Sequence, residues 1–157
     1  MFYMVKVLAS GVFDILHLGH IHYLKEAKKL GDKLVVVVAT DTRVRKQKHE
    51  PITPQEMRLE MVRSLKCVDE AVMGEDGDMY DIVTRIKPDI IALGYDQSHD
   101  PKRIQNELLK RSLKNIKVVR LPQFDHDLDG TRKIIRKIID WHAFQEKMKK
   151  IEGDKKI

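Results

Sequence analysis

The sequence predicts an α/β fold in which an open, mostly parallel sheet of five strands carries helices on both of its faces. Short apolar runs alternate with segments of helical periodicity along the chain, as they do where helices connect parallel strands. Residues 33–39 contain an unbroken run of valines, which is typical of a strand covered on both faces. The length of 157 residues suits one domain with a substantial core.

The first half of the chain contains three of the predicted strands. In order, the elements are a strand at 5–9, a helix at 23–30, the strand at 33–39, a helix from Thr53 and a strand at 68–73. Three residues mark the start of the second helix: Thr53 as the cap, Pro54 at the first helical position and Glu56 three residues after the cap.

The second half continues the alternation of strands and helices. In order, the elements are a helix from Asp78 that Pro88 ends, a strand at 90–93, a helix opened by Asp100 and Pro101, a strand at 118–121 and a long helix from about Thr131. The long helix has an apolar stripe made of Ile134, Ile135, Ile138 and Ile139. The whole pattern is Rossmann-like, and ligands of such sheets bind beyond the carboxyl ends of the strands.

Residues 11–20, Gly-Val-Phe-Asp-Ile-Leu-His-Leu-Gly-His, lie where the first strand turns into the first helix. Backbone N–H groups and the positive end of the helix dipole attract anions at such a turn. His17 and His20 can add hydrogen bonds to phosphate oxygens, and Gly19 has no side chain to block a close approach. These residues predict a nucleotide site. The alternatives are a purely structural histidine pair or a metal pair, although zinc would need a further ligand.

This decamer resembles the GxFDxxHxGH motif of the nucleotidylyltransferase superfamily. Its members include glycerol-3-phosphate cytidylyltransferases, phosphopantetheine and NMN adenylyltransferases, and archaeal FAD synthases. The resemblance implies catalytic roles for His17 and His20. It also implies a nucleotide-binding role for much of the motif, namely Gly11, Val12, Phe13, His17, Leu18, Gly19 and His20.

A basic segment, residues 43–48, follows the second strand and is predicted to be a loop at the same edge of the sheet as the decamer. Taken alone, a basic loop is usually only solvated. In cytidylyltransferases and archaeal FAD synthases a K-x-K pair occupies this position, and Lys46 and Lys48 match it. The resemblance implies that Lys46 is catalytic and that Lys48 binds the triphosphate. Arg58 aligns with a family arginine, and it either orients this segment or lies on the helix surface.

Two further segments resemble family motifs. Gly94-Tyr95-Asp96-Gln97 is similar to the G-x-D-Q of archaeal FAD synthases, which implies that Asp96 lies in the ATP site; the alternative is a plain Gly-Asp turn. Gly130 and Thr131 match part of a stretch that holds the β- and γ-phosphates, and a simple helix cap is the alternative. Residues 123–126 replace the R-T-E-G of the cytidylyltransferases, which weakens a CTP assignment.

The resemblance to archaeal FAD synthases implies transfer of AMP from ATP to FMN, giving FAD and pyrophosphate, with Mg²⁺ or another divalent cation on the triphosphate. One alternative is a cytidylyltransferase that makes a CDP-alcohol from CTP and glycerol 3-phosphate or a similar phosphate. Another, from a different class, is a non-catalytic nucleotide- or nucleic-acid-binding module, which the basic tail would suit.

Composition and charge indicate which partners and which cellular compartment to expect. The formal charge of +6 is spread along the chain and suits phosphorylated substrates, so a nucleic-acid partner is not expected. Cys67 is the single cysteine, which excludes an internal disulfide and fits a reducing cytoplasm; no apolar stretch is long enough to span a membrane. We expect a catalytic nucleotidylyltransferase domain at 1–140 and a basic helical extension at 141–157. In the extension, apolar residues recur at three- to four-residue steps. Members of the family are commonly dimers, so the resemblance implies a homodimer.

Overall fold

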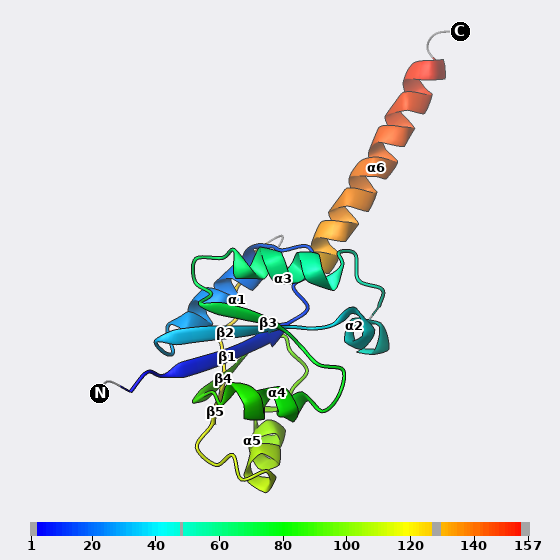
Figure 1. Ribbon diagram of the computed structural model, residues 1–157. Coiled ribbons are helices and arrows are strands. Elements are labelled where there is room, and N and C mark those ends of the chain that lie inside the picture. The colour runs from blue at the N-terminus through cyan, green and yellow to red at the C-terminus, as the bar shows by residue number, and fades with distance from the viewer. Residues whose placement is uncertain (1–2, 48, 127–129, 155–157) are drawn as a thin grey trace.

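The computed structural model describes residues 3–47, 49–126 and 130–154 (Figure 1). Five strands form one sheet in the order β3-β2-β1-β4-β5, and each pair of neighbouring strands is parallel. The strands are β1 (Lys6–Gly11), β2 (Lys33–Val38), β3 (Glu70–Met73), β4 (Ile90–Leu93) and β5 (Lys117–Arg120). The predicted five-stranded open sheet is confirmed, and the described strands are parallel throughout.

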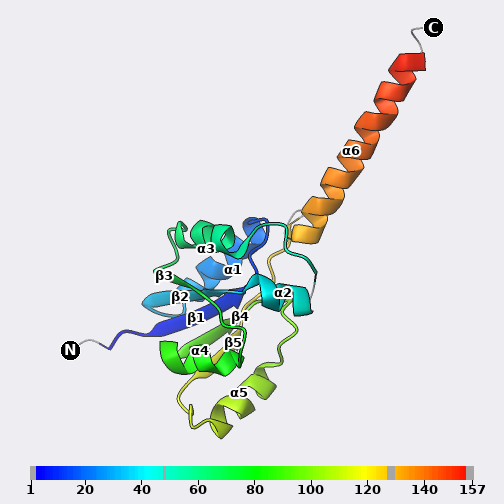
Figure 2. The ribbon, with the colours of Figure 1, turned by 45° about the vertical axis from the view of Figure 1, so that its right-hand side comes forward.

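Helices cover both faces of this sheet, as predicted. In Figures 1 and 2, α1 and α3 lie over one face, whereas α4 and α5 lie over the other. The helices are α1 (Leu18–Lys28), α2 (Asp41–Gln47), α3 (Gln55–Arg63), α4 (Met79–Ile86), α5 (Pro101–Lys110) and α6 (Thr131–Asp154).

The valine run of β2 supplies side chains to two separate hydrophobic cores. Successive strand residues point to opposite faces of a sheet. Val36 therefore packs in one core with Leu24 of α1 and Val62 of α3. Val37 packs in the other core, with Leu108 of α5. Burial on both faces explains why this strand is apolar at every position after its first residue.

The structure confirms the predicted helix starts at Asp78, Asp100 and Thr131, whereas α1 begins at Leu18 and not at the predicted residue 23. Asp78 and Asp100 cap α4 and α5, each by accepting a backbone N–H from two residues further on. The predicted cap at Thr53 is wrong, because Pro54 occupies the N-cap position of α3 and makes no side-chain capping bond. The side chain of Thr53 instead donates to Asp14, at the turn that carries the decamer.

Residues 43–47 of the basic segment after β2 lie in a helix and not in the predicted loop. Asp41 lies in the first turn of α2, whereas Arg45 and Lys46 lie in its last turn, so charges of both signs complement the helix dipole. Val44 is buried and anchors the helix to the body of the protein. Lys48 lies outside the described residues.

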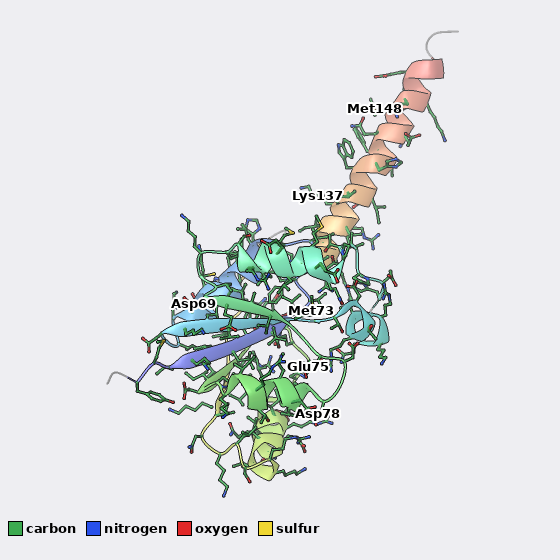
Figure 3. The ribbon with its side chains drawn as sticks, in the orientation of Figure 1. Asp69, Met73, Glu75, Asp78, Lys137 and Met148 are labelled. Carbon is green, nitrogen blue, oxygen red and sulfur yellow. The ribbon has the colours of Figure 1, made fainter. Side chains whose placement is uncertain are left out.

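Helix α6 is continuous across the predicted boundary between 140 and 141 and extends away from the sheet (Figures 1 and 2). Figure 3 shows Lys137 and Met148 on this projecting part. Its predicted apolar stripe is largely solvent-facing, since Ile138 and Ile139 are more than half exposed. Among the described helices, none is long and apolar enough to cross a membrane.

Candidate functional site

A cavity of about 1050 Å³ opens at the carboxyl ends of the strands. Most residues with a predicted role line it: Gly11, Val12, Phe13, His17, Gly19, His20, Asp96, Gly130 and Thr131. Leu18 and Lys46 are not among the lining residues and are exposed. On α2, the cavity is lined by Arg43 and Gln47 instead. Four segments that are distant in sequence therefore meet around one space.

The backbone of the motif turn is held in an unusual conformation. Phe13 and Ile15 have φ angles of 56° and 50°, in the left-handed region that costs a non-glycine residue about 1–3 kcal/mol. The ring of Phe13 is buried and folds back under Gly11, where an added Cβ would lie 2.9 Å from it. Gly11 is therefore required by this close approach, and the surrounding contacts must stabilise the turn.

Asp14 supplies much of that stabilisation. Its buried carboxylate accepts the backbone N–H groups of Ile52 (2.7 Å) and Thr53 (2.9 Å) and the Thr53 hydroxyl (2.6 Å). Burial alone would raise the pKa of this carboxyl, but the hydrogen bonds and the charge of Arg58 outweigh it, so the pKa lies below its ordinary value. The Asp14 carbonyl accepts the Thr131 hydroxyl at 2.7 Å, which joins the motif turn to the start of α6.

We expect Asp14→Asn to destabilise the protein by about 1–3 kcal/mol at neutral pH, because the amide presents a donor to groups that already donate. A lowered folded-state pKa means that the ionised form contributes stability above pH about 4, and that this contribution is lost as the pH falls through the folded-state pKa. Urea denaturation between pH 7 and pH 3 should show the gap between wild type and variant narrowing in acid. Asp140→Asn, on the exposed face of α6, is the control. A gap that stays constant with pH would contradict this role of Asp14.

The two motif histidines are stacked at the start of α1. His17 is the N-cap residue, and its Nδ1 accepts the backbone N–H of Gly19 at 3.1 Å. Because Nδ1 is the acceptor, the proton of the neutral ring is on Nε2, which is then a donor. The centroids of the His17 and His20 rings lie 3.7 Å apart, and the rings of His20 and Phe13 meet in a T-shaped contact with centroids 5.3 Å apart. Packing thus fixes both imidazoles beside a helix N-terminus, where anions bind.

Arg58 is a buried structural arginine and not a surface residue. It is 0% exposed, and it donates to the carbonyl oxygens of Val12 (2.6 Å) and Ala39 (2.9 Å) and to Oδ1 of Asp41 (2.6 Å). One guanidinium therefore ties Val12, which follows β1 (the motif strand), to residues 39–41, which lead into α2. Of the two alternatives from the sequence, the structure supports the one in which Arg58 orients this segment.

Arg43 ties the other side of the cavity. Its Nη2 donates to the carbonyl oxygens of Glu75 (3.0 Å) and Gly77 (2.6 Å) in the loop between β3 and α4. Figure 3 shows Glu75 and Asp78 on this loop, beyond the carboxyl end of β3. Arg43 was expected only as part of a basic loop, and its bonding to carbonyl groups has no signature in the sequence.

The loop after β4 is anchored to the motif strand. Gln97 accepts the Gly94 N–H through Oε1 (3.2 Å) and donates through Nε2 to the carbonyl of Ser10 (2.8 Å). The Tyr23 hydroxyl donates to the carbonyl of Ala92 (2.8 Å), and burial raises its pKa, so it stays protonated. Asp96 is exposed within this anchored loop and lines the cavity. The sequence left the role of Gln97 open, and the structure makes it the link between the two strand ends.

Among residues 3–47, 49–126 and 130–154, no three His, Cys, Asp or Glu side chains form a cluster that could hold a metal ion. The acidic residues that line the cavity differ in their surroundings. Asp14 is saturated by hydrogen bonds, Glu75 pairs with Arg85, and Asp78 caps α4 and pairs with Arg111; the others are Asp96 and Asp125. Cys67 is half-buried, and burial raises the pKa of its thiol, which fits an unreactive side chain.

Comparison with known proteins assigns the family. A family model described as "Cytidylyltransferase-like" matches residues 8–150. The chain belongs to the cytidylyltransferase-like family. Within it, curated relatives named FAD synthase cover most of the chain. The protein from Aciduliprofundum boonei is 58% identical over 87% of this chain and 92% of its own length. The one from Ferroglobus placidus is 46% identical over 94% of this chain and its entire length.

Solved structures with the same fold include one protein of high sequence identity and one of low identity. A Thermoplasma volcanium protein described as a lipopolysaccharide core biosynthesis protein has a TM-score of 0.76 and 51% identity, covering 78% of this chain and all of that chain. A pantoate-beta-alanine ligase from Francisella tularensis, at 15% identity and a TM-score of 0.56, covers 78% of this chain and 60% of that chain, and it shows the fold alone. The predicted membership of this superfamily is confirmed.

Proposed function

We propose that the protein is an FMN adenylyltransferase, an FAD synthase that transfers AMP from ATP to FMN and releases pyrophosphate. The observation that carries this function is the 58% identity to a named FAD synthase over nearly the full length of both chains. A Thermoplasma volcanium relative with the same name is 48% identical over 87% of this chain and 96% of its own length. None of the three relatives is named a cytidylyltransferase, so the CTP alternative is not favoured.

The proposed reaction needs positioning and charge neutralisation more than proton transfer. A non-bridging phosphate oxygen of FMN attacks the α-phosphorus of ATP, and the bond from that phosphorus to the α,β-bridging oxygen breaks as pyrophosphate leaves. A phosphate monoester has a second pKa of about 6 and is a dianion near neutrality, so no general base is required. Preorganised donors around the leaving group are then the main source of acceleration.

The site supplies such donors from several directions. We propose that His17 and His20, with the N-terminus of α1, bind the phosphates and the charge that grows on the bridging oxygen. Gly130 and Thr131, at the start of α6, would hold the terminal phosphates; because the Thr131 hydroxyl donates to Asp14, that contact would use its backbone N–H. Asp96 would meet the ribose. The resemblance of residues 46–48 to the family K-x-K pair supports a triphosphate-binding role for Lys46 and Lys48.

We also propose that a divalent cation, Mg²⁺ by preference, binds with the triphosphate. Mg²⁺ usually keeps several waters and takes one or two carboxylates plus substrate phosphates. Asp125 also lines the cavity and is the carboxylate that would suit this role, because Asp96 is assigned to the ribose. When bound, the ion would neutralise phosphate charge.

A substrate matrix tests the function. Pyrophosphate release is measured with ATP or CTP against FMN, glycerol 3-phosphate and phosphopantetheine, and products are separated by chromatography. We expect turnover with ATP and FMN, with FAD as the product. Faster release from CTP and glycerol 3-phosphate would contradict it. Salt-sensitive binding of DNA or RNA without any turnover would favour the non-catalytic module.

The proposed partner of the protein is a second copy of itself, in the cytoplasm. Trp141 and Phe144 are 63% and 58% exposed on α6, and Met148 and Ile151 continue the same three- to four-residue spacing. We expect sedimentation analysis to show a dimer that Trp141→Asp converts to a monomer. Lys137→Asp, which changes charge on the same helix without removing an apolar side chain, is the control. A wild-type monomer at all concentrations would contradict the dimer.

A further inference from the structure

The side chain of Arg120, the last residue of β5, binds backbone carbonyl groups of the loop after β4. Its guanidinium donates to the carbonyl oxygens of Gly94 (2.6 Å) and Gln97 (3.0 Å), and to that of His99. The loop therefore wraps around one planar cation. Arginine suits this geometry because its donors are arranged in a fixed fork, whereas lysine presents a single ammonium group.

Arg120 lies at the point where the pairing between β4 and β5 ends. The parallel ladder pairs Leu93 with Arg120, and one more backbone bond joins Leu121 to the Leu93 carbonyl. Beyond Leu93 the chain leaves the sheet, and a backbone bond from the Gln97 N–H to the Gly94 carbonyl (3.3 Å) replaces strand pairing. From this point the guanidinium of Arg120 binds the carbonyl groups of the loop, those of Gly94, Gln97 and His99.

The same loop is held from its other side by the motif strand. Gln97 bonds both Gly94 and the carbonyl of Ser10 through its amide. The loop is therefore anchored both to β1 and to β5, and its residues line the cavity. Asp96 lies between these two anchors and lines the cavity, as do the loop residues on either side of it.

We propose that Arg120 is a positioning residue for the nucleotide, which holds the loop 94–99 in place so that Asp96 meets the nucleoside half of ATP. The inference rests on the proposed function for the identity of that nucleotide. Arg120 is not itself among the residues that line the cavity. Its effect on the reaction is exerted through the loop.

Variants of Arg120 can separate this role from general stability. Arg120→Gln removes the charge and the fork, and Arg120→Lys keeps only the charge. Lys117→Gln is the matched control, because Lys117 is an exposed cation at the opposite end of the same strand. The measurements are the calorimetric Kd for an ATP analogue blocked at the α,β-bridge, with Mg²⁺, the KM values for ATP and FMN, kcat, and the thermal midpoint.

We expect Arg120→Gln to raise the analogue Kd and the KM for ATP by about tenfold to a hundredfold, as misplacement of a binding group does. The KM for FMN and the thermal midpoint should stay near wild type, Arg120→Lys should fall between the two, and Lys117→Gln should change nothing. An unchanged analogue Kd in Arg120→Gln would overturn the proposal. The proposal would also be overturned if Arg120→Gln lost affinity for ATP and FMN equally and had a lower thermal midpoint, because that result indicates a merely structural role.

The analogue measurement keeps this proposal separate from the proposed function. A wild type that binds the analogue but makes no FAD would refute FMN as the acceptor, and the comparison of Kd values would still decide the role of Arg120. A wild type that does not bind the analogue would overturn both.

Discussion

Replacing His20 with alanine should lower kcat for FAD formation by about a hundredfold or more, which is the usual loss when one preorganised donor to a transition-state charge is removed. His20 is placed for this role by packing, since its ring stacks on that of His17, with centroids 3.7 Å apart, and makes a T-shaped contact with Phe13, with centroids 5.3 Å apart. The rate of FAD formation at saturating concentrations of ATP and FMN measures the effect. Thermal unfolding should show that the variant folds, because the side chain is only half-buried.

His142→Ala is the matched control for this loss. His142 is exposed on α6, well beyond the start of that helix at Thr131, so its removal should leave kcat within a factor of about two, as for surface substitutions away from a site. A His20→Ala enzyme that is folded and turns over at a near-normal rate would remove His20 from the catalytic machinery.

Replacing Arg58 with methionine should destabilise the protein by about 3–5 kcal/mol, the range expected when one partner of a buried ion pair is removed. The methionine fills similar space but donates no hydrogen bond. The Val12 and Ala39 carbonyls and the half-buried Asp41 carboxylate would then lose their donor. Urea denaturation at pH 7 measures the change in the free energy of unfolding.

Two further variants sharpen this measurement. Arg58→Lys retains the charge but can reach fewer of the acceptors, so its destabilisation should be smaller than that of Arg58→Met. Arg103→Met removes an exposed arginine from α5 and should change the free energy of unfolding by less than about 0.5 kcal/mol. If Arg58→Met behaved like Arg103→Met, the proposed tie between the motif strand and α2 would be wrong.

The sequence alone predicted the sheet and most of the helices because these elements depend on local patterns. Residues 33–39 indicated a strand buried on both faces, and it packs into two cores. Asp78 and Asp100 indicated helix starts, and both are caps. The motif at 11–20 placed His17 and His20 at a strand-to-helix turn, where the structure has them.

What the sequence could not predict depends on contacts between distant residues. A buried arginine and a surface arginine look alike in a helix, so only the fold reveals that Arg58 reaches Val12, 46 positions earlier. Arg120 reads as an ordinary residue at the end of a strand. Helix α2 was interpreted as a loop because it is short and rich in charge, although the single buried side chain of Val44 anchors it.

The central claim is that donors and positive helix ends around the cavity at the carboxyl edge of the sheet bind a nucleoside triphosphate. Titration calorimetry of folded wild-type protein with ATP and Mg²⁺ tests it most directly. We predict saturable binding with one ATP per chain, weakened when His17 and His20 are both replaced by alanine. The claim would be contradicted if folded protein gave no binding heat with ATP at any temperature tried and did not retain ATP in equilibrium dialysis.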